Sequence, residues 1–103
     1  MRGILALFFL VVTATQAGAD SIDRGRALLE KNCSRCHAIA LEGESPFRPA
    51  PPFREVMKIY PAEALTEALG EGLITGHPAM PEFVFPPDEV GAIVDYLKTL
   101  DGP

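Results

Sequence analysis

The only two cysteines of the chain, Cys33 and Cys36, lie three residues apart, and His37 follows them directly. A chain of 103 residues has room for one domain. So small a domain struggles to bury enough apolar surface by itself. Small exported domains usually add disulfides, but a bridge between cysteines this close would close no useful loop. Something else should therefore complete the core, and a large, flat, apolar cofactor would do so.

The first residues have the features of an export signal. Arg2 is followed by an uncharged run from Gly3 to Ala19, which is most apolar early on and ends in small residues. This pattern predicts a signal peptide over residues 1–19 and a mature domain over residues 20–103. The alternative is an uncleaved membrane anchor. The strongly apolar part is shorter than the ~20 residues needed to span a bilayer, which favours cleavage.

The chain is acidic, with a formal net charge of −5. Arg2 is the one charged residue of the leader, so its removal would take the net charge to −6. Nucleic acid is therefore an unexpected partner. The charge could steer the protein to a basic docking patch, or it could serve solubility alone.

Apolar spacing predicts helices over residues 22–36, 53–60 and 62–69. Ser21 is placed to cap the first of these, and Gly70 and Gly72 to end the third. A last helix should begin at Pro87, with acidic residues in its first turn. Its expected buried stripe is Val90, Ile93, Val94, Leu97 and Leu100, and Gly102 should end it.

Two loops rich in glycine and proline separate these helices, over residues 41–52 and 76–87. The chain has no segment with the alternating pattern of a strand, no internal repeat and no low-complexity tract. The predicted fold class is all-α.

The Cys-x-x-Cys-His motif is the attachment signature of c-type haem. Two cysteines at the end of a helix can form thioethers with the two vinyl groups of a porphyrin, and His37 can then present a nitrogen to the iron. We therefore expect one covalently attached haem c on Cys33 and Cys36.

Other readings of the same residues remain open. A thioredoxin-like redox pair would need a βαβ context. A zinc site would need further ligands, and only one other histidine, His77, exists. A simple vicinal disulfide would leave His37 and the missing core unexplained.

The second axial position of the iron could take methionine, histidine or no protein ligand. Met80 lies between Pro78 and Pro81, which should stiffen its loop and favour it as the ligand. Met57 falls on the apolar face of the 53–60 helix, together with Phe53, Val56 and Tyr60, and a core role is expected for it. His77 is the alternative ligand.

On these residues the chain resembles the class I, monohaem cytochromes c, and most closely the small bacterial periplasmic ones. Its matching residues are Gly25 and Leu29 in the first helix; Cys33, Cys36 and His37; Met80; and Ile93, Tyr96 and Leu97 in the last helix. The resemblance implies that the N- and C-terminal helices cross near Gly25, with short helices and Pro-rich loops wrapping the haem. It also implies that the carbonyl of Pro51 orients the imidazole of His37.

The chain departs from mitochondrial members in its shorter loop between Ala38 and Ala50, its lack of tryptophan and its acidity. Arg48 and Arg54 are candidates to hold the haem propionates, with a solvated surface role as the alternative.

The resulting hypothesis is a one-electron carrier with His37 and Met80 on the iron, rather than an enzyme. We expect a periplasmic monomer that meets redox partner proteins and has no stable membrane insertion once the leader is removed. The alternatives are a haem subunit of a larger periplasmic oxidoreductase and a haem protein that binds a small ligand.

Overall fold

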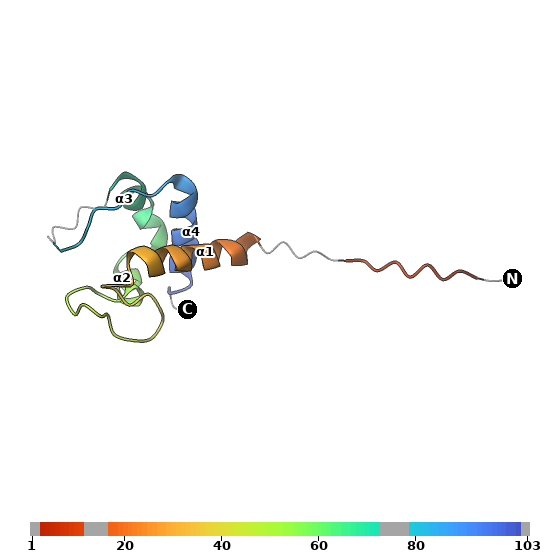
Figure 1. Ribbon diagram of the computed structural model, residues 1–103, viewed down its shortest axis with the longest axis horizontal. Helices are drawn as coiled ribbons and strands as arrows, with labels where there is room; N and C mark the ends of the chain where they lie inside the picture. The colour runs from red at the N-terminus through yellow and green to blue at the C-terminus, as the bar shows by residue number, and fades with distance from the viewer. Residues whose placement is uncertain (1–2, 12–16, 73–78, 102–103) are drawn as a thin grey trace.

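The computed structural model describes residues 3–11, 17–72 and 79–101 of the chain. Its elements are α1 (Ala17–Asn32), α2 (Phe53–Ile59), the short 3₁₀ helix η1 (Ala62–Leu65), α3 (Thr66–Glu71) and α4 (Pro87–Lys98), shown in Figure 1. The described ranges contain helices and loops but no strand, which confirms the all-α prediction. None of the helices in these ranges is long and apolar enough to cross a membrane.

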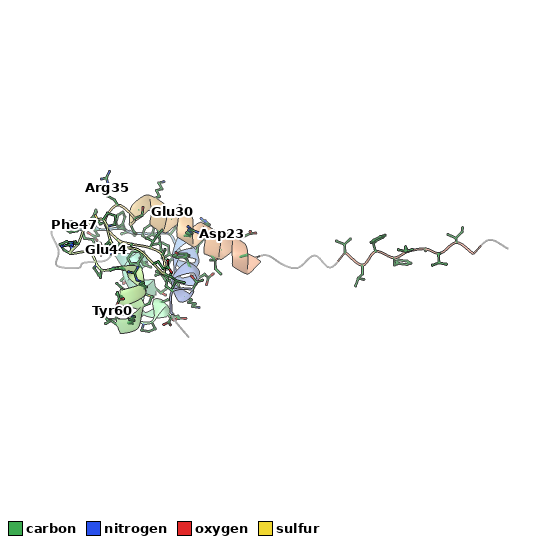
Figure 2. All side chains as sticks on the ribbon, turned by 90° about the horizontal axis from the view of Figure 1, so that it is seen from below. Asp23, Glu30, Arg35, Glu44, Phe47 and Tyr60 are labelled. Carbon is green, nitrogen blue, oxygen red and sulfur yellow. The ribbon has the colours of Figure 1, made fainter. Side chains whose placement is uncertain are left out.

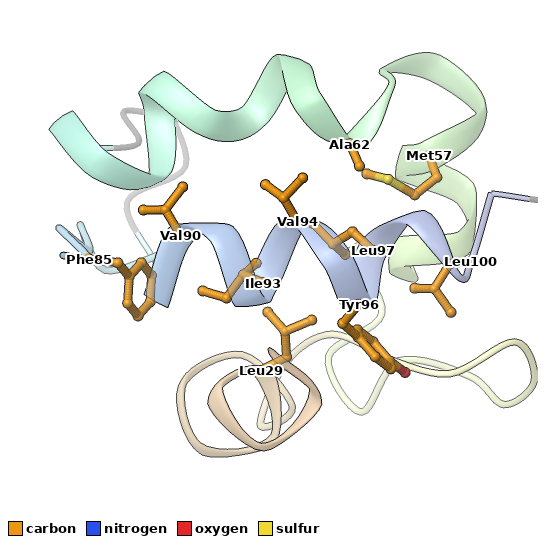
Figure 3. Close-up of a cluster of buried hydrophobic side chains, with 10 residues drawn as sticks. All are labelled: Leu29, Met57, Ala62, Phe85, Val90, Ile93, Val94, Tyr96, Leu97 and Leu100. Carbon is orange, nitrogen blue, oxygen red and sulfur yellow. The ribbon is translucent and has the colours of Figure 1, made fainter. Parts of the chain in front are cut away.

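Helix α4 is the centre of the core, because other elements pack against two of its sides. Figure 3 shows α1 on one side of α4, with Leu29 pointing toward it, and the η1 and α2 segments on the other. The predicted apolar stripe of α4 is buried at all five positions. Pro87 occupies the first turn together with Asp88 and Glu89, as predicted. The helix itself ends at Lys98, and Gly102 lies outside the described residues.

Helices α1 and α4 cross where Gly25 meets the backbone of Ala92. A Cβ added to Gly25 would lie 1.9 Å from the carbonyl oxygen of Ala92 and 2.9 Å from the Cβ of Tyr96. Only a residue without a side chain allows so close an approach. The predicted crossing of the N- and C-terminal helices near Gly25 is therefore confirmed.

Polar contacts join the same two helices along their length. The hydroxyl of Ser21 donates to the carboxylate of Asp95 at 2.6 Å, and Arg24 forms an ion pair with Asp88 at 2.8 Å. The prediction that Ser21 caps the first helix is wrong, because α1 begins at Ala17 and Ser21 lies inside it. Contact with α4 gives the hydroxyl a partner that the local sequence could not reveal.

The middle helices cover the opposite side of α4. Met57 of α2 is 4% exposed and Ala62 of η1 is 1% exposed, which confirms Met57 as a core residue. Tyr60 was expected on the same buried face, but it is exposed, because the chain becomes extended there before Pro61. Gly72 ends α3 with a φ of 114°, a left-handed conformation that favours glycine.

The N-terminal segment over residues 3–11 is exposed and has no regular structure. Ala17 to Ala19, which lie on the leader side of the predicted cut, form the start of α1. Cleavage after Ala19 remains a prediction, and it would leave α1 to begin at Asp20.

Candidate haem-binding site

Helix α1 leads directly into the Cys-x-x-Cys-His segment, which forms a tight turn. The amide of Cys33 donates to the carbonyl of Leu29 at 2.8 Å, and the amides of Cys36 and His37 both donate to the carbonyl of Cys33, at 3.2 and 2.9 Å. These bonds keep the backbone coiled beyond the last helical residue. Both cysteines are free thiols and partly exposed, so no disulfide joins them. The segment thus presents two cysteine side chains one turn apart.

Cys33 packs against the hydrophobic core, and this environment controls its acidity. Burial raises the pKa of its thiol to about 11, because the thiolate would lose its hydration. The thioredoxin-like reading of the motif fails on other grounds, because the described ranges contain no strand and so lack the βαβ context that this reading needs. Over the described ranges, no three histidine, cysteine or acidic side chains gather as a metal-binding group.

The imidazole of His37 is held by the loop that precedes α2. Its Nδ1 lies 2.7 Å from the carbonyl oxygen of Pro51. A carbonyl can only accept, so Nδ1 must carry the proton, and the neutral ring then keeps its lone pair on Nε2. This tautomer is the one that a metal ligand bound through Nε2 requires.

The ring of Phe53 stacks on the imidazole of His37. The ring centroids are 4.7 Å apart and the planes are inclined by 22°. The amide of Phe53 also donates to the carbonyl of Ala38 at 3.0 Å, which ties the start of α2 to the residue after His37. Sequence reasoning assigned Phe53 to the apolar face of α2 and missed this contact. The sequence signal that could have indicated this contact is the position of Phe53, two residues after Pro51.

The loop over residues 38–52 is fastened to the motif by several hydrogen bonds. Ser45, a buried residue, accepts a bond from the amide of Ala38 at 2.9 Å, and the amide of Phe47 donates to the carbonyl of Cys36 at 3.2 Å. The hydroxyl of Tyr96 on α4 donates to the carbonyl of Ile39 at 2.5 Å. Side chains from distant elements thus fix a loop that has no regular structure of its own.

Exposed side chains of mixed character surround this loop. Figure 2 shows Arg35, Glu44 and Phe47 at the end of the molecule away from the N-terminal segment. Arg48 is exposed, while Arg54 is half-buried and donates to the carbonyl of Ala40 at 3.4 Å. The propionate role suggested for these two arginines remains a prediction.

Met80 lies on a separate segment, over residues 79–86, that enters α4. This segment is attached to α3 by the amide of Phe85, which donates to the carbonyl of Leu69 at 2.9 Å, and the rings of Phe83 and Phe85 stack. Met80 is half-buried. Among the residues described, no hydrogen bond or ring contact joins it to His37. Figure 1 places this segment and the C-terminal end of α1 on the same side of the molecule. His77 lies outside the described residues.

The chemistry of these side chains fits a covalently attached haem. Two free thiols one turn apart suit two vinyl groups, and protonation of His37 at Nδ1 leaves Nε2 available for iron. Burial raises the pKa of Cys33 and so disfavours the thiolate that binding of a bare metal cation would need.

Comparison with known proteins identifies the family. The family described as cytochrome c oxidase, cbb3-type, subunit III, matches residues 20–97, which include all five predicted site residues. No curated protein and no solved structure matches the chain. The chain therefore belongs to this family and is a monohaem c-type cytochrome, with covalently bound haem c and a function in electron transfer.

Proposed function

We propose that the protein is a one-electron carrier in which Cys33 and Cys36 hold the haem and His37 and Met80 bind its iron. The observation that carries this proposal is the 2.7 Å hydrogen bond from His37 to the carbonyl of Pro51. A buried or functional histidine needs a partner for Nδ1 if Nε2 is to act as a ligand in a fixed orientation. Pro51 supplies that partner from a backbone that proline itself stiffens.

The residues around the site favour electron transfer without rearrangement. When bound, haem supplies a ferric/ferrous couple. The turn at Cys33, the bond to Pro51 and the contact between Phe53 and Ala38 fix both sides of His37. A histidine held in this way would move little when the iron changes its oxidation state, so the reorganisation energy of electron transfer would be small. No substrate needs to bind.

The two methionines of the domain suit different roles. Met57 is buried in the cluster around α4, so its sulfur is committed to core packing. Met80 lies in an irregular segment between prolines and is half-buried. A thioether ligand raises the potential of a haem by favouring ferrous iron. His77, three residues before Met80, is the alternative ligand.

Members of this family act with redox partners and are typically exported. We propose a periplasmic location in a Gram-negative bacterium after removal of residues 1–19, and a monomeric state. The acidic surface would steer the protein to basic partners at low salt. The encounters of such carriers use small interfaces, below about 1,200 Å².

A second candidate is a haem subunit of a larger oxidoreductase. The family description, which names a subunit of an oxidase, favours it. The two candidates share the same haem site and differ in whether a partner stays bound. The mass of the native protein isolated from its source under mild conditions separates them, since a carrier would run as a single chain no heavier than the 11.1 kDa of the full sequence plus one haem.

The experiment that tests the ligand set uses optical spectra of the full chain, produced together with haem-attachment machinery. We expect sharp α and β bands on reduction, a weak far-red band on oxidation that marks sulfur ligation, and no response of the reduced protein to carbon monoxide. Met80→Ala should lose the far-red band and bind carbon monoxide. Met57→Leu is the matched control and should keep the band.

Two results would contradict the proposal. Carbon monoxide binding by the reduced wild-type protein at neutral pH would indicate an open iron and favour a sensor or an enzyme. A Met80→Ala variant with an unchanged spectrum, together with a His77→Ala variant that binds carbon monoxide, would transfer the ligand role to His77.

A further inference from the structure

His37 has two contacts of different kinds. Its Nδ1–H, which lies in the plane of the imidazole, donates to the carbonyl of Pro51, whereas the ring of Phe53 stacks on one face of the imidazole. The expected role of Pro51 accounts for the first contact only. The second contact has no part in the function derived above.

A single hydrogen bond does not fix the plane of an imidazole. The ring can pivot about the line from Nδ1 to its acceptor while the bond length stays the same, and hydrogen bonds to carbonyls tolerate a broad range of such angles. A second ring stacked at 4.7 Å prevents this pivot, because one edge of the imidazole would move into it. The stack therefore removes the motion that the hydrogen bond permits.

Phe53 can act in this way only if it is itself fixed, and three features fix it. Its amide is bonded to the carbonyl of Ala38, it is the first residue of α2, and its side chain packs against the buried cluster around α4. Ala38 directly follows His37, so the two stacked rings are attached to backbones that are hydrogen-bonded to each other. The hydrogen bond between the backbones of Phe53 and Ala38 thus sets the distance between the two rings.

We propose that Phe53 is a positioning residue that sets the plane of the His37 imidazole at the haem iron. The proposal rests on the proposed ligation of iron by His37, and it adds that the hydrogen bond to Pro51 sets the tautomer while Phe53 sets the orientation. Phe53 does not touch the iron; it acts through His37.

The readout is the spread of the four haem-methyl proton shifts in the NMR spectrum of the oxidised protein. In low-spin ferric haem, this spread depends on the plane of the axial imidazole, and a ring that samples several orientations averages it. Phe53→Leu keeps an apolar side chain but removes the flat ring. We expect it to change the order of the four shifts or to reduce their spread, with His37 still bound.

Two further variants separate positioning from general loosening of the core. Phe53→Tyr restores a flat ring and should keep the wild-type pattern. Val94→Ala truncates a buried core residue of α4, outside the 79–86 segment that carries Met80, so it should lower stability and leave the pattern unchanged. An unchanged pattern in Phe53→Leu would overturn the proposal, as would an equal change in Val94→Ala.

A measurement on the wild-type protein decides the matter if Phe53→Leu does not fold. In the reduced, diamagnetic state, we expect nuclear Overhauser contacts between the ring protons of His37 and Phe53, and their absence would overturn the proposal. Failure of the proposed function would look different. In that case the wild-type protein itself would lack the spectrum of a histidine-ligated c-type haem.

Discussion

Replacing Gly25 by alanine should weaken the contact between α1 and α4. Of the glycine-to-alanine substitutions in these two helices, it should have the largest effect. The added Cβ would lie 1.9 Å from the carbonyl oxygen of Ala92 and 2.6 Å from its carbonyl carbon. Both atoms belong to the backbone of α4, so no side-chain rotation can relieve the overlap. The two helices must separate or tilt instead.

The size of the effect follows from this distance. Ordinary contact begins at 3.4 Å, so the helices must give way by about 1.5 Å along that direction. Gaps of 0.5–1 Å already lose about a quarter to a half of the dispersion energy between facing atoms, and Leu29 and Ile93 face each other's helices here. Overpacking typically costs about 1–3 kcal/mol, and we expect about 3–4 kcal/mol at this backbone contact. The helix propensity of alanine returns about 1 kcal/mol.

The net loss of about 2–3 kcal/mol is a large part of the roughly 5–15 kcal/mol that stabilises a typical domain. It should appear in guanidinium unfolding of the haem-loaded protein followed by far-ultraviolet circular dichroism. Gly91→Ala is the matched control, because it lies on α4 and its added Cβ meets no atom within 4 Å. We expect that control to gain up to about 1 kcal/mol. A Gly25→Ala protein at least as stable as the wild type would refute the reasoning.

Three further predictions concern stability. The hydrogen bond from Arg24 holds the pKa of Asp88 below its usual value. The ion pair therefore stabilises the fold above pH ~4, and this stabilisation is lost as the pH falls further. The free energy of unfolding of Asp88→Asn should accordingly depend less on pH in acid than that of the wild type. Tyr96→Phe should cost about 1 kcal/mol at pH 7 by removing the bond to Ile39. Burial raises the pKa of Tyr96, so the wild type loses stability as the pH rises above ~10, and its advantage in urea unfolding over Tyr96→Phe should shrink there. Met57→Ala should lower the free energy of unfolding by about 2–5 kcal/mol while the far-red band of sulfur ligation persists; loss of that band would make Met57 the ligand.

The helical part of the fold could be predicted from the sequence because each signal was local. The stripe on α4 follows from apolar spacing, and Pro87 and Gly72 mark helix ends through the backbone conformations that they favour. The start of α1 was misplaced because Ser21 has the composition of a cap but finds Asp95 on a distant helix. Tyr60 was misplaced because spacing cannot show that the helix stops just before it.

Some residues of the candidate site could likewise be predicted from the sequence, and others could not. Cys33, Cys36 and His37 could be recognised because their chemistry depends on adjacency in the chain. The contacts of Ser45 and Phe53 with the motif could not be predicted, because they depend on how the 38–52 loop folds back on it. No periodicity describes such a loop. Stacking between His37 and Phe53 depends on a backbone bond that only a three-dimensional structure reveals.

The side-chain contacts between α1 and α4 hold the two ends of the domain together. Ser21 and Asp95, which are separated by 74 positions in the chain, are joined by a direct hydrogen bond. The elements and loops between the two helices therefore start and end at segments that are already held together. The entropic cost of closing a flexible loop rises only logarithmically with its length, so each doubling costs about 0.6 kcal/mol. Insertions in the exposed part of the 38–52 loop would thus cost little stability, so this loop can change in size while the contact between α1 and α4 stays constant.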